Sequence, residues 1–257
     1  MKVTALLETR GLTKYFGGLT AVDRLDFHFK EGEIVGLIGP NGAGKTTVFN
    51  LITGIIRPTV GHVIFDEKDI TGMKPHVVAR LGIGRTFQMS PLFGDFSVLQ
   101  NVRASFYLHP KSRWRAAFFN TSVYRRNERQ ITEQAIGILE LLKLDKVKHR
   151  LAKNLHHGYQ KMLGIARALA TKPKLLLLDE PLGGMNPDEI DFAMGVIEKT
   201  RLEGITILLV EHNMQIMDIV DRVVVINFGQ KICEGTIEEI RENQEVVEAY
   251  FGVEDPA

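Results

Sequence analysis

Short runs of hydrophobic residues mark the two ends of the chain and predict strands of two kinds. Ile34–Ile38, Leu175–Leu178 and Ile205–Val210 are continuous runs of four to six mostly apolar residues. Runs of this length are typical of strands that are buried on both faces of a parallel sheet. Val22–Phe29 differs, because polar residues separate most of its apolar ones. That alternation predicts a strand with one buried and one exposed face.

Helices are expected between these strands. Thr46–Ile52 follows the first apolar run. Pro187–Glu203 lies between the last two, with Asn186 as its predicted N-cap and a proline at its first position. Two further strands are predicted at His62–Phe65 and Val223–Ile226. Strands that alternate with helices in this way predict a parallel sheet covered by helices.

The middle of the chain has a different pattern. From about Pro91 to Ala170 the sequence has helical periodicity and few segments typical of strands. Apolar residues recur as on one face of a helix at Ile131, Ala135, Ile138, Leu139 and Leu142. Because no repeat or low-complexity linker separates this region from its neighbours, we expect a helical insertion within an α/β core.

Composition narrows the classes of function. The 257 residues are 44% hydrophobic and 25% charged, which is ordinary for a globular protein. The formal net charge of +1 gives no indication of a nucleic-acid partner, and we expect none. Ile205–Val210 is far shorter than the roughly 20 apolar residues that a membrane-spanning helix needs. If the protein serves transport across a membrane, another chain must therefore form the path.

A glycine-rich loop follows the first buried strand and carries the strongest chemical motif. It fits the pattern G-x-x-x-x-G-K-[ST] and continues to a second threonine: Gly39, Pro40, Asn41, Gly42, Ala43, Gly44, Lys45, Thr46 and Thr47. Glycines let backbone N–H groups turn toward phosphate oxygens, and the following helix N-terminus favours an anion. Lys45 would add a positive charge at the β- and γ-phosphates of ATP, and Thr46 a hydroxyl ligand for Mg²⁺. The competing interpretation, a chance glycine turn, is disfavoured by the complete motif between strand and helix.

The buried strand Leu175–Leu178 brings two carboxylates to its C-terminal end, the edge at which α/β sheets bind ligands. Asp179 is predicted to hold Mg²⁺ through water. Glu180 points elsewhere and is predicted to orient or deprotonate the water that attacks ATP. Alone, Asp-Glu is an ordinary polar strand end. Together with the glycine-rich loop it predicts an enzyme that hydrolyses ATP with Mg²⁺.

Five further stretches occur in the order found in ABC ATPases, so the chain resembles that family over nearly its whole length. They match the adenine-stacking aromatic, the glutamine loop, the L-S-G-G-Q signature, the D-loop and the switch histidine: Lys14–Gly18, Arg85–Gln88, Leu155–Gln160, Leu182–Asn186 and Val210–His212. The resemblance implies an α/β P-loop NTPase (RecA-like) core with a parallel sheet, an antiparallel β subdomain and an inserted α-helical subdomain. It implies a single domain over 1–257, with a nucleotide-binding core of 1–88 and 171–235, a helical subdomain of 89–170 and a tail of 236–257.

The resemblance also assigns roles to single residues. Gln88 would bind Mg²⁺ and sense the attacking water, and His212 would contact the γ-phosphate. Phe16 would stack on adenine, with Tyr15 as the alternative and Val22 close to the same base. The simpler interpretations are a solvated loop glutamine, an ordinary strand-end histidine and a core aromatic.

The signature departs from the family pattern, which has Ser at 156, Gly at 157 and Gln at 159. The six residues here are Leu155, His156, His157, Gly158, Tyr159 and Gln160. By resemblance, two subunits face head to tail, and each signature grips the ATP on the opposite phosphate loop. We expect the ATP on this chain's own loop to turn over, and the ATP on the partner's loop to be hydrolysed slowly or merely held. The alternative is that the variation is tolerated and both sites are active.

Four stretches bear a closer resemblance to the ATP-binding subunits of branched-chain amino-acid importers: Gly82–Gln88, Ser105–Arg129, Asp179–Pro187 and Val246–Gly252. This implies two transmembrane permease subunits, a second and different ABC ATPase, and a periplasmic or lipid-anchored solute-binding protein that acts indirectly. It places the chain at the cytoplasmic face of the inner (plasma) membrane as a peripheral subunit. Related ATPases serve urea, amides and aromatic acids. The alternatives are the ATPase of a lipid or lipopolysaccharide exporter and a soluble ABC ATPase with no role in transport.

Two segments are candidates for contact with the permease or with the membrane surface. Met89–Phe93 is mostly apolar, and by resemblance it would contact a coupling helix of the permease. Lys111–Phe119 is basic and aromatic, which fits contact with lipid headgroups. The simpler interpretation of Lys111–Phe119 is a helical insert that packs on its own subdomain.

Overall fold

The computed structural model describes residues 5–87, 91–108, 122–211 and 214–251. The strands are β1 Leu7–Phe16, β2 Leu19–Phe29, β3 Ile34–Ile38, β4 Val60–Phe65, β5 Lys68–Asp69, β6 Ile83–Arg85, β7 Leu175–Asp179, β8 Thr206–Val210, β9 Arg222–Asn227 and β10 Gln230–Gly235. The α-helices are α1 Lys45–Ile52, α2 Pro75–Leu81, α3 Val98–Phe106, α5 Ser122–Leu141, α6 His157–Leu169, α7 Pro187–Leu202, α8 Ile237–Glu242 and α9 Gln244–Phe251. Short 3-10 helices are η1 Asp145–Val147, η2 Ala152–Asn154 and η3 Met214–Ile219.

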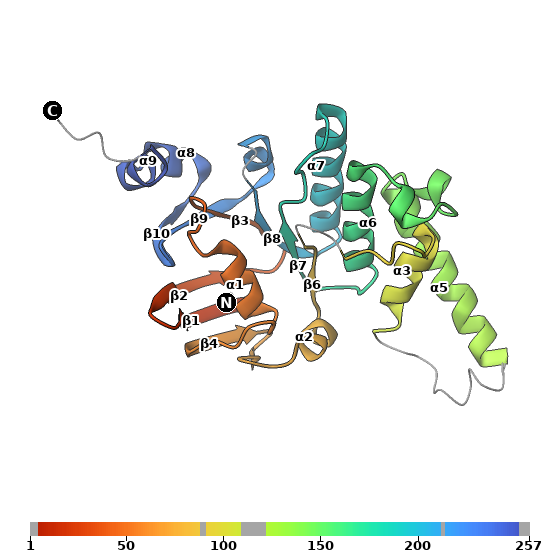
Figure 1. The fold of residues 1–257 in the computed structure, drawn as a ribbon, viewed down its shortest axis with the longest axis horizontal. Helices are drawn as coiled ribbons and strands as arrows, with labels where there is room; N and C mark the ends of the chain where they lie inside the picture. The colour runs from red at the N-terminus through yellow and green to blue at the C-terminus, as the bar shows by residue number, and fades with distance from the viewer. Residues whose placement is uncertain (1–4, 88–90, 109–121, 212–213, 252–257) are drawn as a thin grey trace.

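The strands form two sheets, which lie beside each other in Figure 1. The larger sheet has the order β10-β9-β3-β8-β7-β6, and the smaller sheet has the order β2-β1-β4-β5. Strands β9, β3, β8, β7 and β6 run parallel, whereas β10 pairs antiparallel with β9. The smaller sheet is antiparallel throughout. Both the parallel sheet and the antiparallel β layer that the resemblance implied are therefore present.

Each parallel strand of the centre contributes to two separate hydrophobic cores, one on each face of the larger sheet. In β7, Leu175 and Leu177 belong to one core, and Leu176 and Leu178 to the other. Strands β3, β8 and β9 divide their side chains in the same alternating way. Continuous apolar runs are required here because successive side chains point to opposite faces and both faces are covered.

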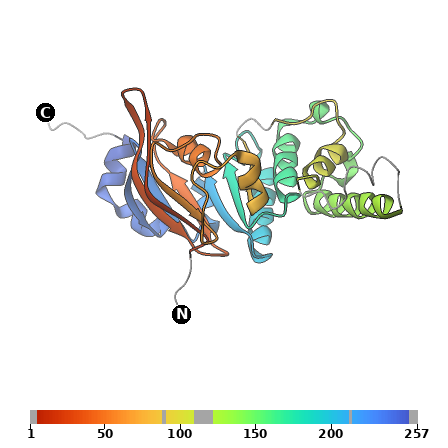
Figure 2. The same ribbon diagram turned by 90° about the horizontal axis from the view of Figure 1, so that it is seen from below.

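Helix α1 occupies the space between the two sheets. Its buried residues share one core with β1, β2 and β4 of the smaller sheet and with β3 of the larger one: Val48, Phe49, Leu51 and Ile52. Figure 2 shows the smaller sheet toward one end of the molecule and a group of helices at the other. The packing of α1 matters for function, because its first residue, Lys45, ends the glycine-rich loop.

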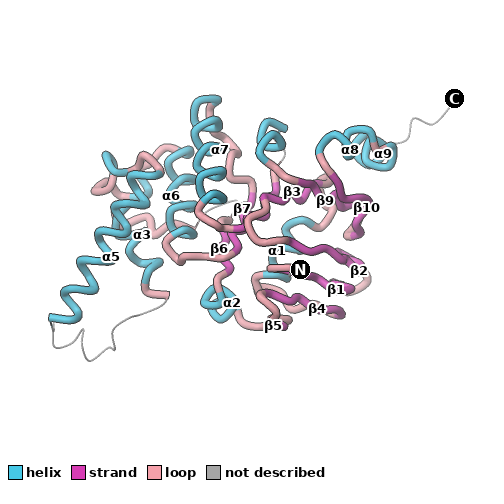
Figure 3. The backbone as a smooth tube through the Cα atoms, turned by 180° about the vertical axis from the view of Figure 1, so that it is seen from behind, coloured by secondary structure: helices cyan, strands magenta, loops and turns pink. Residues whose placement is uncertain are grey.

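Helices α3, α5 and α6 form the helical group, and Figure 3 shows no strand among them in the described chain. Together with α7 and the second face of the larger sheet they form one hydrophobic core, to which they contribute apolar residues such as Val102, Leu139 and Leu163. Helix α3 begins with a capping box between Ser97 and Gln100. This arrangement fits the predicted helical insertion. The proposed boundaries at 88/89 and 170/171 stay a prediction.

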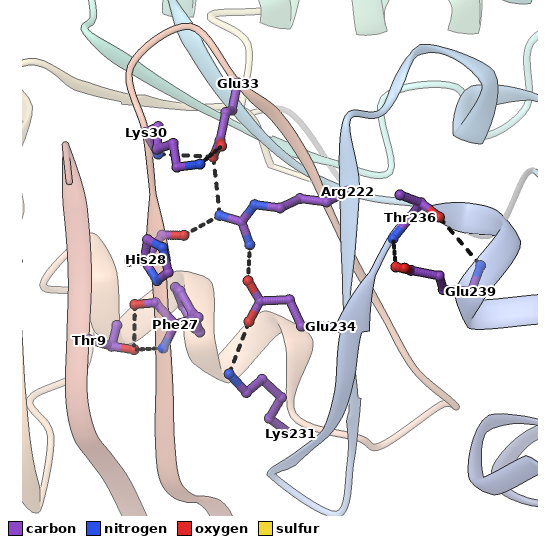
Figure 4. Close-up of polar contacts among 10 residues, drawn as sticks. All are labelled: Thr9, Phe27, His28, Lys30, Glu33, Arg222, Lys231, Glu234, Thr236 and Glu239. Carbon is purple, nitrogen blue, oxygen red and sulfur yellow. Dashed lines mark hydrogen bonds and ion pairs between the residues drawn. The ribbon is translucent and has the colours of Figure 1, made fainter. Parts of the chain in front are cut away.

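Arg222 joins the smaller sheet to the larger one at the edge formed by β9 and β10 (Figure 4). Its guanidinium forms ion pairs with Glu33, at 3.1 Å, and with Glu234, and donates a hydrogen bond to the carbonyl oxygen of His28 in β2. Lys231 pairs with the other side of Glu234 at 3.0 Å. The network supports the sheet edge and lies apart from the loop discussed below.

The predicted elements are largely confirmed. Helix α7 begins at Pro187 behind a capping box of Asn186 and Glu189, and it ends one residue earlier than predicted. The alternating strand Val22–Phe29 is the second half of β2, with its apolar side chains buried. The unpredicted elements are β1, β5, β6, β10, α2, α8 and α9. Of these, the three-residue strand β6 is important for the site.

Candidate functional site

The glycine-rich loop connects the C-terminal end of β3 to the start of α1, and it passes very close to neighbouring backbone. A Cβ atom at Gly39 would lie 2.1 Å from the carbonyl oxygen of Ile226, and one at Gly44 would lie 2.5 Å from that of Ala21. Gly44, the N-cap of α1, has a φ of 103°. Side-chain-bearing residues are excluded by this spacing and this dihedral, so glycine is needed at both positions. The motif therefore has the strand-loop-helix context that phosphate binding requires.

Lys45 is buried inside this loop, with 8% of its surface exposed. Its ammonium donates hydrogen bonds to the carbonyl oxygens of Gly39, at 2.6 Å, and Pro40, at 2.9 Å. Burial lowers the pKa of Lys45, while the negative charges of Glu180 and Asp179 act in the opposite direction. The predicted carboxylates and the predicted phosphate-binding lysine are thus close enough to interact. Asn41, Gly42 and Thr46 are exposed, and Ala43 is buried beneath the loop.

Asp179 is the last residue of β7 and is 5% exposed. Its carboxylate forms an ion pair with Arg85 at 3.0 Å, and its backbone N–H donates to the hydroxyl oxygen of Thr86 at 3.1 Å. Burial lowers the pKa of Arg85, whereas the hydrogen bond to Asp179 raises it. Arg85 and Thr86 come from β6 and the residue that follows it. The sequence places both in the predicted glutamine-loop motif but indicates no role for either.

Glu180 follows in a left-handed backbone conformation, with a φ of 47°. Its N–H donates to the carbonyl oxygen of Val210 at 2.9 Å, and its own carbonyl accepts a hydrogen bond from Lys161 at 2.9 Å. This turn of the backbone follows directly on the end of β7 at Asp179. A non-glycine residue with positive φ is uncommon and is often found at functional sites.

The D-loop and the switch-histidine strand meet behind Glu180. The N–H of Leu182 donates to the carboxylate of Glu211 at 2.7 Å, and Glu211 is 5% exposed. Burial lowers the pKa of Lys161, while Glu180, Glu211 and Asp179 act against this change. Sequence reasoning missed Lys161 and Glu211. Each is a charged residue next to apolar residues in the sequence, and this is the one signal that could have indicated a role in the site.

The signature residues form the start of α6. His156 is the N-cap of this helix but makes no side-chain cap, and both His156 and His157 are exposed. The ring of His156 lies 3.9 Å from that of Tyr159, measured between centroids, and its Nδ1 lies 3.5 Å from Glu189. Gln160 turns inward and donates to the carbonyl oxygen of Leu155 at 2.9 Å.

Two close contacts restrict Gly158 and His157, the remaining residues of the signature. A Cβ atom at Gly158 would lie 2.5 Å from the carboxylate of Glu189, so this glycine has a packing reason. His157 packs against the D-loop, where a Cβ atom at Gly184 would lie 2.7 Å from the imidazole. In the described part of the chain, no hydrogen bond or ion pair joins residues 155–160 to residues 39–47. The loop leads into α1 and the signature into α6, and Figure 1 shows these two helices apart from each other.

The candidate adenine-stacking residues lie in the smaller sheet. Tyr15 and Phe16 are both about half exposed, at 44% and 45%, so their exposure does not separate the two candidates. The ammonium of Lys14 lies 5.1 Å from the centroid of the Phe16 ring. Val22 is fully buried beneath the loop, at 0% exposed, and its side chain offers no surface to a base. The expected contact of Val22 with adenine therefore lacks support in this structure.

Several predicted residues lie outside the described chain. They are Gln88, His212, Met89, Ser90 and the insert Lys111–Phe119. Of the predicted coupling segment, Leu92 packs against the helical core, whereas Phe93 is 47% exposed. Arg167 donates to the carbonyl oxygen of Pro91 at 2.6 Å and lies over the Phe93 ring. Of these two adjacent apolar residues, Phe93 is therefore the one exposed at the surface.

No group of three or more histidine, cysteine, aspartate or glutamate side chains among the described residues is placed to hold a metal ion by itself. None of the helices in the described ranges has both the length and the apolar character needed to cross a membrane.

Two family models match the sequence. The model described as ABC transporter matches residues 22–183, which contain the glycine-rich loop, the signature and Glu180. The model described as branched-chain amino acid ATP-binding cassette transporter matches residues 230–256, the last strand and the tail.

Similar proteins align over almost the whole chain. It is 43% identical over 249 residues to the high-affinity branched-chain amino acid transport ATP-binding protein BraF of Pseudomonas aeruginosa, covering 96% of this chain and 98% of that protein. It is 40% identical to LivG of Escherichia coli K12, a protein of the same description, with the same coverage. A probable branched-chain amino acid transport ATP-binding protein LivG of Archaeoglobus fulgidus is 38% identical, covering 97% of this chain and 96% of that protein.

Solved structures give the same result for the fold. A nucleotide-free ATP-binding cassette from an ABC transporter superposes with a TM-score of 0.85 at 34% identity, covering 97% of this chain and 100% of that one. The ADP conformation of the cassette MJ1267 superposes with a TM-score of 0.83 at the same identity and coverage.

Proposed function

Because the chain belongs to the ABC transporter family of ATP-binding proteins, which hydrolyse ATP to drive transport, we propose that it energises an importer of branched-chain amino acids. The observation that carries the choice of substrate is similarity that extends from the first strands through the tail, where the second family model matches. The relatives carry this substrate class in their names, and the chain aligns with nearly their full length.

The loop between β3 and α1 is proposed to bind the phosphates of ATP. Its glycines bring backbone N–H groups close to the ligand, and the N-terminus of α1 adds the positive end of a helix dipole. Lys45 supplies a positive charge from inside the loop, where its ammonium now lies against two carbonyl oxygens. Adenine is proposed to stack on Phe16 or Tyr15, whose rings are both accessible.

Mg²⁺ is proposed to accompany ATP, held by the hydroxyl of Thr46, by Gln88 and, through water, by Asp179. The hydroxyl and carboxylate oxygens in the described chain fit this hard cation, which usually combines one or two protein oxygens with phosphates and water. The influence of Asp179 on the pKa of Lys45 supports the closeness of these groups. The bound ion would neutralise charge on the β- and γ-phosphate oxygens.

Glu180 is proposed to position the attacking water and accept its proton, and His212 to donate a hydrogen bond to the γ-phosphate. Supporting this role for Glu180 are its place at the end of β7 and its left-handed backbone, which is held from two sides by Val210 and Lys161. The three residues thus have different proposed roles. Lys45 binds the phosphates, Asp179 holds Mg²⁺ through water, and Glu180 positions the attacking water.

The separate positions of loop and signature support a head-to-tail pair of ATPase subunits, each completing the other's site. We propose that the partner ATPase is a different but related chain. The signature here offers His156 and His157 instead of a hydroxyl and a glycine, and His157 carries a ring against Gly184. The ATP on this chain's loop is therefore proposed to turn over, and the ATP on the partner's loop to turn over slowly.

The remaining partners follow from transport. Two permease subunits are proposed to form the membrane path, and a periplasmic or lipid-anchored binding protein to deliver the amino acid. The chain itself is proposed to sit at the cytoplasmic face of the membrane as a peripheral subunit.

Reconstitution tests the proposal. The chain, its partner ATPase and two permeases are placed in vesicles with the binding protein, and uptake of labelled leucine, isoleucine and valine is compared with uptake of urea and benzoate. We expect ATP-dependent uptake of the three amino acids. Uptake of urea or benzoate alone would reassign the substrate. Copurification with ribosomes and not with permeases would contradict a role in transport.

A further inference from the structure

A buried arginine lies between the two elements that are proposed to hold Mg²⁺. Arg85 is the last residue of β6, where it pairs with Leu177 of β7, two residues before Asp179. Its side chain is 6% exposed, so it cannot touch ATP directly. Arginine remains positively charged even when buried. Any effect of Arg85 on the reaction must therefore pass through its neighbours.

The guanidinium of Arg85 contacts both elements at once. Nη2 donates to Oδ2 of Asp179 at 3.0 Å. Nη1 donates to Oδ1 of Asn50 at 2.7 Å and lies 3.3 Å from the hydroxyl of Thr53. Asn50 belongs to α1 and Thr53 is its C-cap. One side chain thus links the strand that ends in Asp179 to the helix that begins with Lys45 and Thr46.

Two aromatic rings hold this guanidinium in place. The ring centroid of Phe49, in α1, lies 5.3 Å from Cζ of Arg85, and that of Phe87 lies 4.7 Å from it. Contacts of this kind restrict the planar fork and leave its N–H groups few alternative directions. The position of the Asp179 carboxylate is correspondingly restricted.

The residue that follows Arg85 also holds Asp179, through the backbone of the aspartate. Its backbone N–H donates to the hydroxyl of Thr86, and the N–H of Thr86 donates to the carbonyl oxygen of Leu177 at 2.9 Å. Arg85 engages Oδ2 only, and the described residues provide no hydrogen bond to Oδ1. The carboxylate is therefore fixed by one oxygen while the other faces away from the arginine.

We propose that Arg85 is a positioning residue of the Mg²⁺–ATP site, which aims the Asp179 carboxylate and fixes its distance from α1. The inference rests on the proposed role of Asp179 in holding Mg²⁺. Residues that orient a metal-binding group commonly change metal affinity by about 10- to 100-fold when they are removed.

The sign of the effect distinguishes positioning from a simple charge effect. A guanidinium near a divalent cation repels it, so removal of the positive charge by itself would tighten Mg²⁺ binding. Loss of positioning has the opposite effect, because the carboxylate is then free to turn toward other cations that it interacts with, such as Lys45 and Lys161. Positioning by Arg85 thus predicts weaker Mg²⁺ binding in an uncharged variant.

The test uses the full chain and a fluorescent ATP analogue. Affinity for the analogue is measured in EDTA and then across a Mg²⁺ titration, for the native chain, Arg85→Met, Arg85→Lys and Asp179→Asn. For Arg85→Met we expect a half-saturating Mg²⁺ concentration about tenfold higher, with affinity in EDTA changed less than about twofold. Arg85→Lys, which keeps one charged contact, should recover part of the loss.

Arg222→Met is the matched control, because it also removes an arginine from ion pairs but lies at the far edge of the sheet. It should lower thermal stability without changing the Mg²⁺ titration. An unchanged or tighter Mg²⁺ requirement in Arg85→Met would overturn the proposal, even if the variant is less stable. If Asp179→Asn also binds Mg²⁺ normally, the assignment of Asp179 fails instead, so the two failures are distinguishable.

Discussion

The ammonium of Lys161 donates a hydrogen bond to the carbonyl oxygen of Glu180 across 2.9 Å. Lys161 belongs to α6, the helix that begins with the signature, and Glu180 is the proposed catalytic carboxylate. The contact fixes the backbone of Glu180 in its left-handed conformation, with a φ of 47°. A single hydrogen bond therefore connects the helix of the signature, which is proposed to face the partner's ATP, to the residue that is proposed to act on this chain's own ATP.

Replacement of Lys161 by methionine should impair turnover and leave nucleotide binding intact. Methionine keeps most of the length of the side chain but cannot donate to the Glu180 carbonyl. The carboxylate should then be less well placed, and misplacement of a catalytic group by about 1 Å can cost up to about 100-fold in rate. We expect kcat of the assembled transporter to fall at least about tenfold, with KM for ATP changed less than about twofold.

The control for this variant is Lys153→Met, which removes an exposed lysine paired with Asp95 at the surface. It should hydrolyse ATP at the native rate, since exposed ion pairs contribute little. A Lys161→Met variant with native kcat, or one that loses ATP affinity and kcat in parallel, would contradict the positioning role of Lys161.

Lys45→Ala should weaken nucleotide binding itself. The charge that faces the phosphates is lost, so ATP should no longer protect the full chain against thermal unfolding. A ligand at 100 times its Kd stabilises the native state by about 2.7 kcal/mol, so the native chain should show a clear rise in Tm with ATP. The same rise in Lys45→Ala would show that the loop does not bind the phosphates through this residue.

Gly44→Ala should destabilise the fold at the loop. The added Cβ would meet the carbonyl oxygen of Ala21 and would require an alanine at a φ of 103°. Strain of this kind costs about 1–3 kcal/mol, which denaturant unfolding measures directly. Gly195→Ala is the matched control, because this helix position has no atom within 4 Å of the new Cβ. The control should be neutral or more stable by up to about 1 kcal/mol, and equal effects of the two changes would contradict the close approach.

Phe93→Asp should uncouple hydrolysis from transport without unfolding the domain. Phe93 is exposed beside Arg167, and the amide of the buried Asn101 holds the Phe93 backbone in place at 2.9 and 3.0 Å. A negative charge there should weaken an apolar contact with the permease. The ratio of transported amino acid to ATP hydrolysed should fall. The control is Phe228→Asp, at an exposed turn between β9 and β10, which should leave the ratio unchanged. An unaltered ratio in Phe93→Asp would place the coupling surface elsewhere.

The buried strands and the phosphate loop could be predicted because their information is local. A continuous apolar run indicates a strand covered on both faces, and a complete loop motif includes its own glycines and lysine. Strand β6 escaped prediction because three residues, Ile83–Arg85, are too few to show periodicity. Its place in the sheet is set by pairing with β7, which is distant in the sequence.

The roles of Arg85 and Lys161 could not be predicted either, because their partners are also distant in the sequence. Arg85 and Asp179 are 94 positions apart, and nothing near either of them indicates the ion pair. Lys161 lies in the second turn of α6, and a charged residue on a helix ordinarily reaches solvent. In the coupling segment the sequence could not tell which of two adjacent apolar side chains faces outward, because no regular element sets their direction.

Glu180 of this chain is proposed to be the carboxylate that drives turnover in the transporter. The most direct test is the rate of ATP hydrolysis by the assembled transporter with Glu180→Gln in this chain and the partner ATPase left native. Loss of a catalytic base and its electrostatic positioning predicts a fall of about 100-fold or more, while ATP still binds. A transporter that keeps about half or more of the native rate would contradict the account.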